Sequence, residues 1–170
     1  MSGLPDSVAA DLIKKVEAQR LRLGLSMDAL STSAGCGHTY WSDTLNGRSR
    51  YRVRVVDNFQ RCAEAVGYTL GVNGSPASVN QILLAIDRQR DALGMKRYEA
   101  SGIAGIRPCT YSSYMTGSFR PSLIGLVRLA AAVGLRITCE PNFKVTERIY
   151  DTEQSGARAA PFRPMIEPRR

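Results

Sequence analysis

The chain has 170 residues, of which 44% are hydrophobic, so it is long enough to form one or two small apolar cores. No apolar run reaches the roughly 18 residues that a membrane span needs, and the first residues, MSGLPDSVAADLIKK, lack the pattern of a signal peptide. We therefore expect a cytoplasmic protein. The net charge of +8 favours a polyanionic partner, although charge alone accounts only for non-specific attraction.

The types of residue present argue against metal binding and catalysis. The four cysteines lie far apart without a CxxC pair, and the chain has a single histidine, whereas zinc sites need closely spaced cysteine and histidine ligands. We predict reduced, buried thiols, no metal and no cofactor. The sequence also lacks GxSxG, HExxH and Walker motifs and any clustered set of acids and histidines, so we predict that the protein is not an enzyme.

An internal repeat with an offset of 70 positions organises the chain. Residues 24–35, GLSMDALSTSAG, align without a gap with residues 94–105, GMKRYEASGIAG. In the same register, LNGRSR at 45–50 aligns with MTGSFR at 115–120. After a three-residue insertion in the first copy, VVDNFQRCAEAVG aligns with LVRLAAAVG. The pattern indicates one structural unit of about 60 residues that is used twice.

Apolar periodicity and capping residues predict four helices in each copy. In copy one we expect a first helix with Ser7 as its N-cap that ends at Gly24, and then helices from Ser26 to Ser33, from Gly37 to Asn46 and from Asp57 to Val66. In copy two we expect a helix from Asn80 or Gln81 to Leu93 and a break at Gly94. We then expect helices that end at Ile103 and, after the turn at 104–106, at Thr116, and a last helix from Ser122 to Val133.

A β-prone segment follows the last helix of each copy, YTLGV at 68–72 and LRITCE at 135–140. An isolated strand leaves its backbone groups unpaired, so we expect these two segments to pair and to join the copies across a pseudo-twofold axis. The predicted organisation is a first domain at 7–72, a linker rich in Gly, Ser, Asn and Pro at 73–79, a second domain at 80–140 and a flexible tail at 141–170, in which FKVTERIY could add a strand.

Each copy has the features of a helix-turn-helix. A small residue and a glycine, Ala34-Gly35 and Ala104-Gly105, stand where two helices would nearly touch. The following helix has apolar residues at inward positions, Trp41 and Leu45 in one copy and Tyr111 and Met115 in the other. Short polar residues remain on the outer face, where they can reach base edges in a major groove.

These motifs resemble the lambda-repressor-like (Xre/Cro/CI-type) helix-turn-helix family. The resemblance lies in RLRLGLSMDALSTSAGCGHTYWSDTLNGRSR and in RDALGMKRYEASGIAGIRPCTYSSYMTGSFRPSLIGLVRLAAAVGL. It implies a mainly α fold of two tandem five-helix domains, here joined by a short two-stranded antiparallel β-ribbon. The chain departs from the family pattern at Asp28-Ala29, where glutamine is usual, at Pro108, and in carrying two copies.

The resemblance also suggests which residues contact DNA. For base reading we predict His38, Thr39, Ser42, Asp43, Arg107, Cys109, Ser112 and Ser113, of which Arg107 is the best candidate for a guanine contact. For phosphate contact we predict Ser26, Asn46, Arg48, Arg50, Arg52, Arg54, Lys96, Arg97, Thr116, Ser118 and Arg120. The four arginines at 48–54 alternate, which would place them on one side of an extended segment.

We therefore predict a sequence-specific regulator of transcription, such as a repressor, that binds double-stranded DNA. The chain would act as a monomeric pseudo-dimer on an asymmetric operator, or as a homodimer on a longer palindrome, with RNA polymerase or another regulator protein as a further class of partner. The alternative is an antitoxin-like or anti-activator module in which one copy binds a protein. Asp43 and Pro108 favour that alternative, and the choice between activation and repression stays open.

Overall fold

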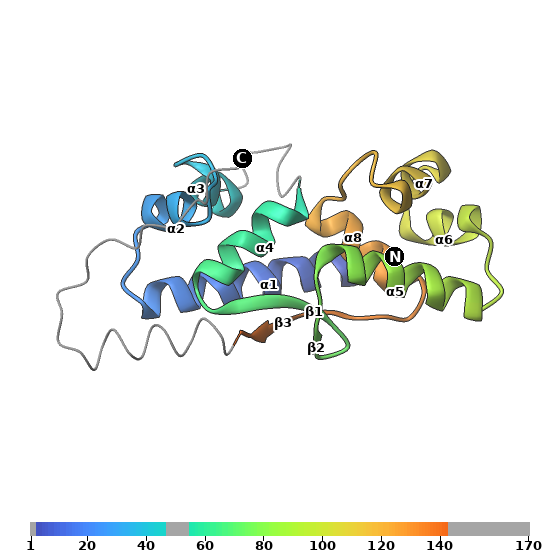
Figure 1. Ribbon diagram of the computed structural model, residues 1–170, viewed down its shortest axis with the longest axis horizontal. Helices are drawn as coiled ribbons and strands as arrows, with labels where there is room; N and C mark the ends of the chain where they lie inside the picture. Colours follow the sequence, from blue (N-terminus) through green and yellow to red (C-terminus); the bar gives the residue numbers. More distant parts are fainter. Residues whose placement is uncertain (1–2, 47–54, 143–170) are drawn as a thin grey trace, which may run out of the picture.

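The computed structural model describes residues 3–46 and 55–142 of the chain, with side chains from Asp6 onwards. These residues form eight helices and one three-stranded antiparallel sheet, so the protein is mainly α-helical (Figure 1). No helix within the described ranges is long and apolar enough to cross a membrane. The predicted basic residues Arg48, Arg50, Arg52 and Arg54 and the segment FKVTERIY lie outside the described residues.

The repeat in the sequence is also a repeat in secondary structure. Copy one forms α1 (Gly3–Arg22), α2 (Met27–Ser33), α3 (Tyr40–Leu45), α4 (Val56–Ala65) and β1 (Tyr68–Val72). Copy two forms α5 (Val79–Ala92), α6 (Arg97–Ala104), α7 (Pro108–Thr116), α8 (Leu123–Ala132) and β3 (Ile137–Pro141). The five-helix expectation is therefore wrong for residues 80–140, which contain four helices. Gly134 ends α8 in the left-handed conformation, and the chain then enters a strand with Ile137 and Cys139 buried.

The predicted pairing between the two copies is confirmed. Strands β1 and β3 are antiparallel, and their register places Leu70 opposite Cys139 and Val72 opposite Ile137. The sheet also contains a strand that we did not predict. β2 (Ser75–Pro76) pairs with the end of β1 and lies in the segment 73–79, which we expected to be a linker.

An Asn-Gly turn produces this extra strand. Asn73 and Gly74 have φ values of 51° and 84°, and two successive residues with positive φ match the right-handed twist of a two-residue hairpin. Thr138 on β3 steadies the turn, because its hydroxyl accepts a 3.3 Å hydrogen bond from the Gly74 amide. The Asn-Gly pair was therefore a hairpin signal within a segment whose composition suggested only a linker.

The buried residues of both copies form one contiguous apolar cluster. Its largest fully buried side chains include Trp41, Tyr111 and Phe59, and the Trp41 and Phe59 rings stack with their centroids 6.3 Å apart. Helix α1 of copy one packs against α8 of copy two, and α8 also packs against α6. The two copies thus share a core, which places α8 at the centre of the molecule.

Helix α1 begins earlier than predicted. It starts at Gly3, so Ser7 lies inside the helix and is not its N-cap. The reason is tertiary: Asp6 in the first turn accepts hydrogen bonds of 2.9 and 3.0 Å from Nη2 of Arg128 on α8. In contrast, α3 is shorter than predicted and begins at Tyr40, because residues 37–39 form a turn in which the Tyr40 amide donates to the Gly37 carbonyl at 2.8 Å.

Gly71→Ala tests the tight approach of β1 to its hairpin. A Cβ at this position would lie 2.6 Å from the Ser75 carbonyl oxygen, and a backbone atom cannot move aside cheaply. We expect the free energy of unfolding to fall by about 1–3 kcal/mol, measured by urea denaturation. The control is Gly102→Ala in α6, where a Cβ meets nothing within 4 Å; helix propensity predicts no loss there and a gain of up to about 1 kcal/mol.

Candidate nucleic-acid interface

A hydrogen-bonded network ties α3 to α1 in copy one. Arg20 is buried and makes a two-point contact with Glu17, with Nε 2.8 Å from Oε2 and Nη2 2.6 Å from Oε1. The Trp41 indole of α3 donates to the same carboxylate at 2.7 Å. Arg20 also donates to the carbonyl of Leu25, just before α2. One arginine therefore holds the end of α1, the entry to α2 and, through Glu17, the first turn of α3.

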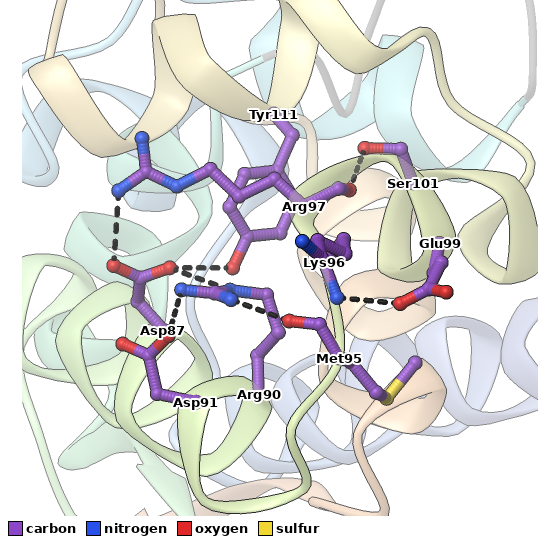
Figure 2. Close-up of polar contacts among 9 residues, drawn as sticks. All are labelled: Asp87, Arg90, Asp91, Met95, Lys96, Arg97, Glu99, Ser101 and Tyr111. Carbon is purple, nitrogen blue, oxygen red and sulfur yellow. Dashed lines mark hydrogen bonds and ion pairs between the residues drawn. The ribbon is translucent and has the colours of Figure 1, made fainter.

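Copy two repeats this network at equivalent positions, 70 residues later (Figure 2). Arg90 is buried and donates from Nε to Asp87 at 3.0 Å and from Nη1 to the Met95 carbonyl at 2.6 Å. The Tyr111 hydroxyl of α7 donates to Asp87 at 2.9 Å. Aspartate replaces glutamate and tyrosine replaces tryptophan, so a shorter carboxylate is matched by a different aromatic donor with the same connectivity.

The network keeps its carboxylates ionised. Hydrogen bonds from Arg20 are the main cause that lowers the pKa of Glu17, and the Trp41 indole adds to them. At Asp87, burial alone would raise the pKa, but the hydrogen bonds from Arg90 and Tyr111 outweigh it and leave the pKa lowered. Burial, followed by the hydrogen bond to Asp87, raises the pKa of Tyr111 to about 12. At neutral pH each network is thus a charged, hydrogen-bonded clasp.

A buried serine lies in the helix before the turn in each copy, and in copy one it connects α2 to α3. Ser31 Oγ donates to the Met27 carbonyl at 2.9 Å and accepts from the Trp41 amide at 3.0 Å. Ser101 Oγ donates to the Arg97 carbonyl at 2.7 Å. Sequence reasoning missed both serines and both arginines. The available signal was the pair of acidic and basic residues, three apart, that recurs in register at 17/20 and 87/90.

The two copies differ at the connection that precedes α3 and α7. Only residues 105–107 separate α6 from α7, and Gly105 is left-handed with φ 65°. In copy one, residues 34–39 separate α2 from α3. Pro108 is the first residue of α7, where its fixed φ suits a helix start and its missing N–H costs nothing. The turn is therefore tighter in copy two.

The predicted base-reading residues form two separate groups. His38 and Thr39 are exposed just before α3, and Ser42 and Asp43 are half-buried within it. In copy two, Arg107 and Cys109 are exposed at the start of α7, and Ser112 and Ser113 are half-buried. Helices α3 and α7 lie at opposite ends of the long axis, and both are on the side away from the sheet (Figure 1). The groups therefore share one side of the molecule.

Most of the described residues that we predicted to contact phosphate are exposed but already have internal contacts. Ser26 caps α2 by accepting from the Ala29 amide at 3.0 Å, and Asn46 donates to Ser42 at 3.2 Å. The Thr116 and Ser118 hydroxyls lie 2.9 Å apart. Lys96 is the exposed N-cap of α6, and Arg97 lies 3.4 Å from Asp87 at the rim of the buried network.

Arg120 has the most extensive internal contacts of this set. It makes a two-point ion pair with Asp57 of copy one, with Nη2 2.6 Å from Oδ1 and Nε 2.9 Å from Oδ2. Its Nη1 donates to Asn80 at 2.7 Å. All three guanidinium nitrogens thus donate to protein partners.

All four cysteines are reduced, as predicted, but they are not all buried. Cys62 and Cys139 are buried, Cys36 is half-buried, and Cys109 is exposed at the start of α7. Burial raises the pKa of the Cys139 thiol to about 11, so this thiol stays protonated. The part of the chain that the structure describes contains no cluster of histidine, cysteine and carboxylate side chains suited to a metal ion.

Arg90→Met should destabilise the fold, because it leaves the Asp87 carboxylate and the Met95 carbonyl without their main donor. We expect the free energy of unfolding to fall by about 2–4 kcal/mol in urea denaturation. Arg88→Met, an exposed arginine on the same helix, should change it by less than about 0.5 kcal/mol. Equal effects of the two substitutions would mean that the network does not stabilise the fold.

Acid should weaken the same networks. The pKa values of Glu17 and Asp87 are lowered on folding, so their stabilisation is complete above the unfolded pKa of about 4 and is lost as the pH falls through the folded pKa. We expect the melting temperature to decrease below about pH 4. The decrease should be shallower in the double variant Glu17→Gln, Asp87→Asn, which has no carboxylate to protonate. An equally steep decrease in that variant would assign the acid sensitivity to other groups.

Comparison with known proteins identifies no family for this chain. No protein-family model matches it, and no match was found among the curated proteins or the solved structures. The geometry of the site is therefore the ground for any functional assignment.

Proposed function

We propose that the protein is a sequence-specific regulator of transcription that binds double-stranded DNA, with α3 and α7 acting as recognition helices of two helix-turn-helix units. The observation that carries the proposal is their placement: both helices follow a glycine turn, both are clasped by the same type of network, and both face the side away from the sheet (Figure 1). One rigid chain would then present two reading elements to one side of a duplex.

The shape of copy two supports this proposal most directly. A three-residue connection with a left-handed glycine is the usual length for a helix-turn-helix. Arg107 is exposed at the N-cap of α7, the end of a recognition helix that reaches base edges. Within the described residues no acidic partner contacts it, so its guanidinium is available for the two acceptors of guanine.

Because the residues that α3 and α7 would present to DNA differ, the two half-sites should differ in sequence. Copy one offers His38, Thr39 and Asp43 at the positions where copy two offers Pro108, Cys109 and Ser113. Two different helices in successive major grooves would read two different half-sites about 10 base pairs apart. The proposed target is therefore an asymmetric operator bound by one chain.

The test is selection of bound sequences from a random duplex pool with the full chain at about 150 mM salt, which screens non-specific phosphate attraction. Enrichment of one asymmetric motif with two unlike halves supports the proposal. A palindrome would mean that chains pair and that one copy does most of the reading. A pool without an enriched motif would refute sequence-specific binding.

Arg107→Ala should reduce binding to the selected sequence by about 1–3 kcal/mol and relax the preference at one base pair, while binding to random DNA changes little. The matched control is Arg136→Ala. Arg136 is also an exposed arginine, but it precedes β3 and its amide is bonded to Asn73 of the hairpin, so it lies on the sheet side. Fluorescence anisotropy with specific and scrambled duplexes distinguishes the two. Equal losses on both duplexes would assign Arg107 to phosphate contact.

A protein-binding role is the second candidate, and one observation favours it. Helix α6 exposes Tyr98 and Ile103, at 60% and 66% of their surface, where α2 of copy one has Asp28 and Ser33. These two exposed apolar side chains make α6 the better candidate than α2 for a protein contact. The double variant Tyr98→Asp, Ile103→Ser introduces the residues that copy one has at these positions. If the apolar pair binds a protein and does not contact DNA, this variant should select the same DNA sequences as the wild type.

A further inference from the structure

The two copies are joined by the sheet, by the packing of α1 against α8, and by a third contact on the side of α3 and α7. In the sheet β1 pairs with β3. In the third contact the first turns of α4 and α8 meet in the middle of the molecule (Figure 1). There the Val56 amide donates to the Pro121 carbonyl at 2.9 Å. The sheet connection lies away from α3 and α7, whereas the third contact lies on their side.

The third contact is reinforced by the ion pair of Arg120 with Asp57. Two parallel hydrogen bonds fix the direction of the guanidinium as well as its position. The side chains of both residues are 33% exposed, so solvent screens the pair only in part. Hydrogen bonds from Arg120 are the main cause that lowers the pKa of Asp57, which keeps the carboxylate charged at neutral pH. The contact to Asn80 adds the start of α5 to the same cluster.

Both residues of this ion pair lie close in the chain to the proposed recognition helices. Asp57 lies in the first turn of α4, which is the next helix after α3. Arg120 lies between Gly117, the C-cap of α7, and Ser122, the N-cap of α8. The pair therefore links the first turn of α4 to the segment through which the chain leaves α7. With the sheet and the packing of α1 against α8 as the pivot, opening this contact would let the two helices, α3 and α7, move apart.

We propose that Arg120 and Asp57 form an inter-copy latch, a positioning pair that sets the separation of α3 and α7 and thereby the spacing of half-sites that the chain accepts. This inference rests on the proposed DNA-binding function. It gives Arg120 a role other than the phosphate contact that the sequence suggested. A latch of this kind makes spacing, in addition to base identity, a determinant of specificity.

The test is the affinity of the full chain for a series of duplexes that carry the selected half-sites at spacings changed one base pair at a time. The wild type should show a sharp optimum, because each added base pair both lengthens and rotates the site. In Asp57→Asn the ratio of affinity at the optimum to affinity one or two base pairs away should fall roughly threefold to tenfold, the size expected for losing a partly exposed two-point ion pair.

Two further variants keep the test specific. Asp11→Asn makes the same charge change at an exposed pair within α1 and should keep the wild-type spacing profile. The double variant Asp57→Arg, Arg120→Asp should restore the profile by reversing the pair. A loss of affinity in Asp57→Asn that is equal at every spacing would overturn the latch and leave only a structural role.

A measurement without DNA separates failure of the latch from failure of the proposed function. Exchange of the Val56 amide with solvent reports opening of the contact to Pro121, and it should accelerate in Asp57→Asn but not in Asp11→Asn. Unchanged exchange at Val56 would overturn the latch. If the wild type selects no DNA sequence while Val56 exchange still accelerates, the contact joins the copies as described, but the role in half-site spacing falls together with the DNA-binding proposal.

Discussion

The buried arginine at the end of α1 and its counterpart on α5 are the interactions on which the rest of the structure depends. A charged side chain that is removed from water must recover its solvation through hydrogen bonds and an opposite charge. Arg20 and Arg90 achieve this with a carboxylate three residues earlier and a carbonyl five residues later, which fixes the turn into α2 and α6. The aromatic donors Trp41 and Tyr111 extend the same clasp to α3 and α7. The surfaces that we propose to read DNA are therefore held from beneath by charge, not only by apolar packing.

Sharing one core is the second constraint. A unit of about 60 residues buries a modest fraction of its surface and is only marginally stable alone. Here α1 of the first copy packs against α8 of the second, and β1 pairs with β3. Because each copy completes the other, their relative orientation is part of the fold and does not depend on a flexible linker. Within this arrangement, we propose that one ion pair, Arg120 with Asp57, sets how far apart α3 and α7 stand.

The two copies share their internal contacts and differ at their surfaces. The clasp, the serine at the turn and the left-handed glycines recur in both copies. Around them the outward residues differ: the entry to α7 is tighter and carries Arg107, and α6 exposes Tyr98 and Ile103. A protein built in this way can assign different tasks to two halves with the same scaffold, whether these are two DNA half-sites or one DNA contact and one protein contact.

The sequence by itself determined the repeat, the order of the helices, most of their ends and the pairing of β1 with β3, because periodicity, capping residues and glycine stops are local signals. It also contained the Asn73-Gly74 turn, which a reading for composition overlooked. Tertiary structure alone decided the early start of α1, which Arg128 holds through Asp6, and the partners of Arg120. Judged from the sequence, an arginine side chain can bind a phosphate or a carboxylate equally well. Arg120 binds a carboxylate because the fold brings Asp57, 63 positions earlier in the chain, next to it. No local sequence pattern encodes that contact.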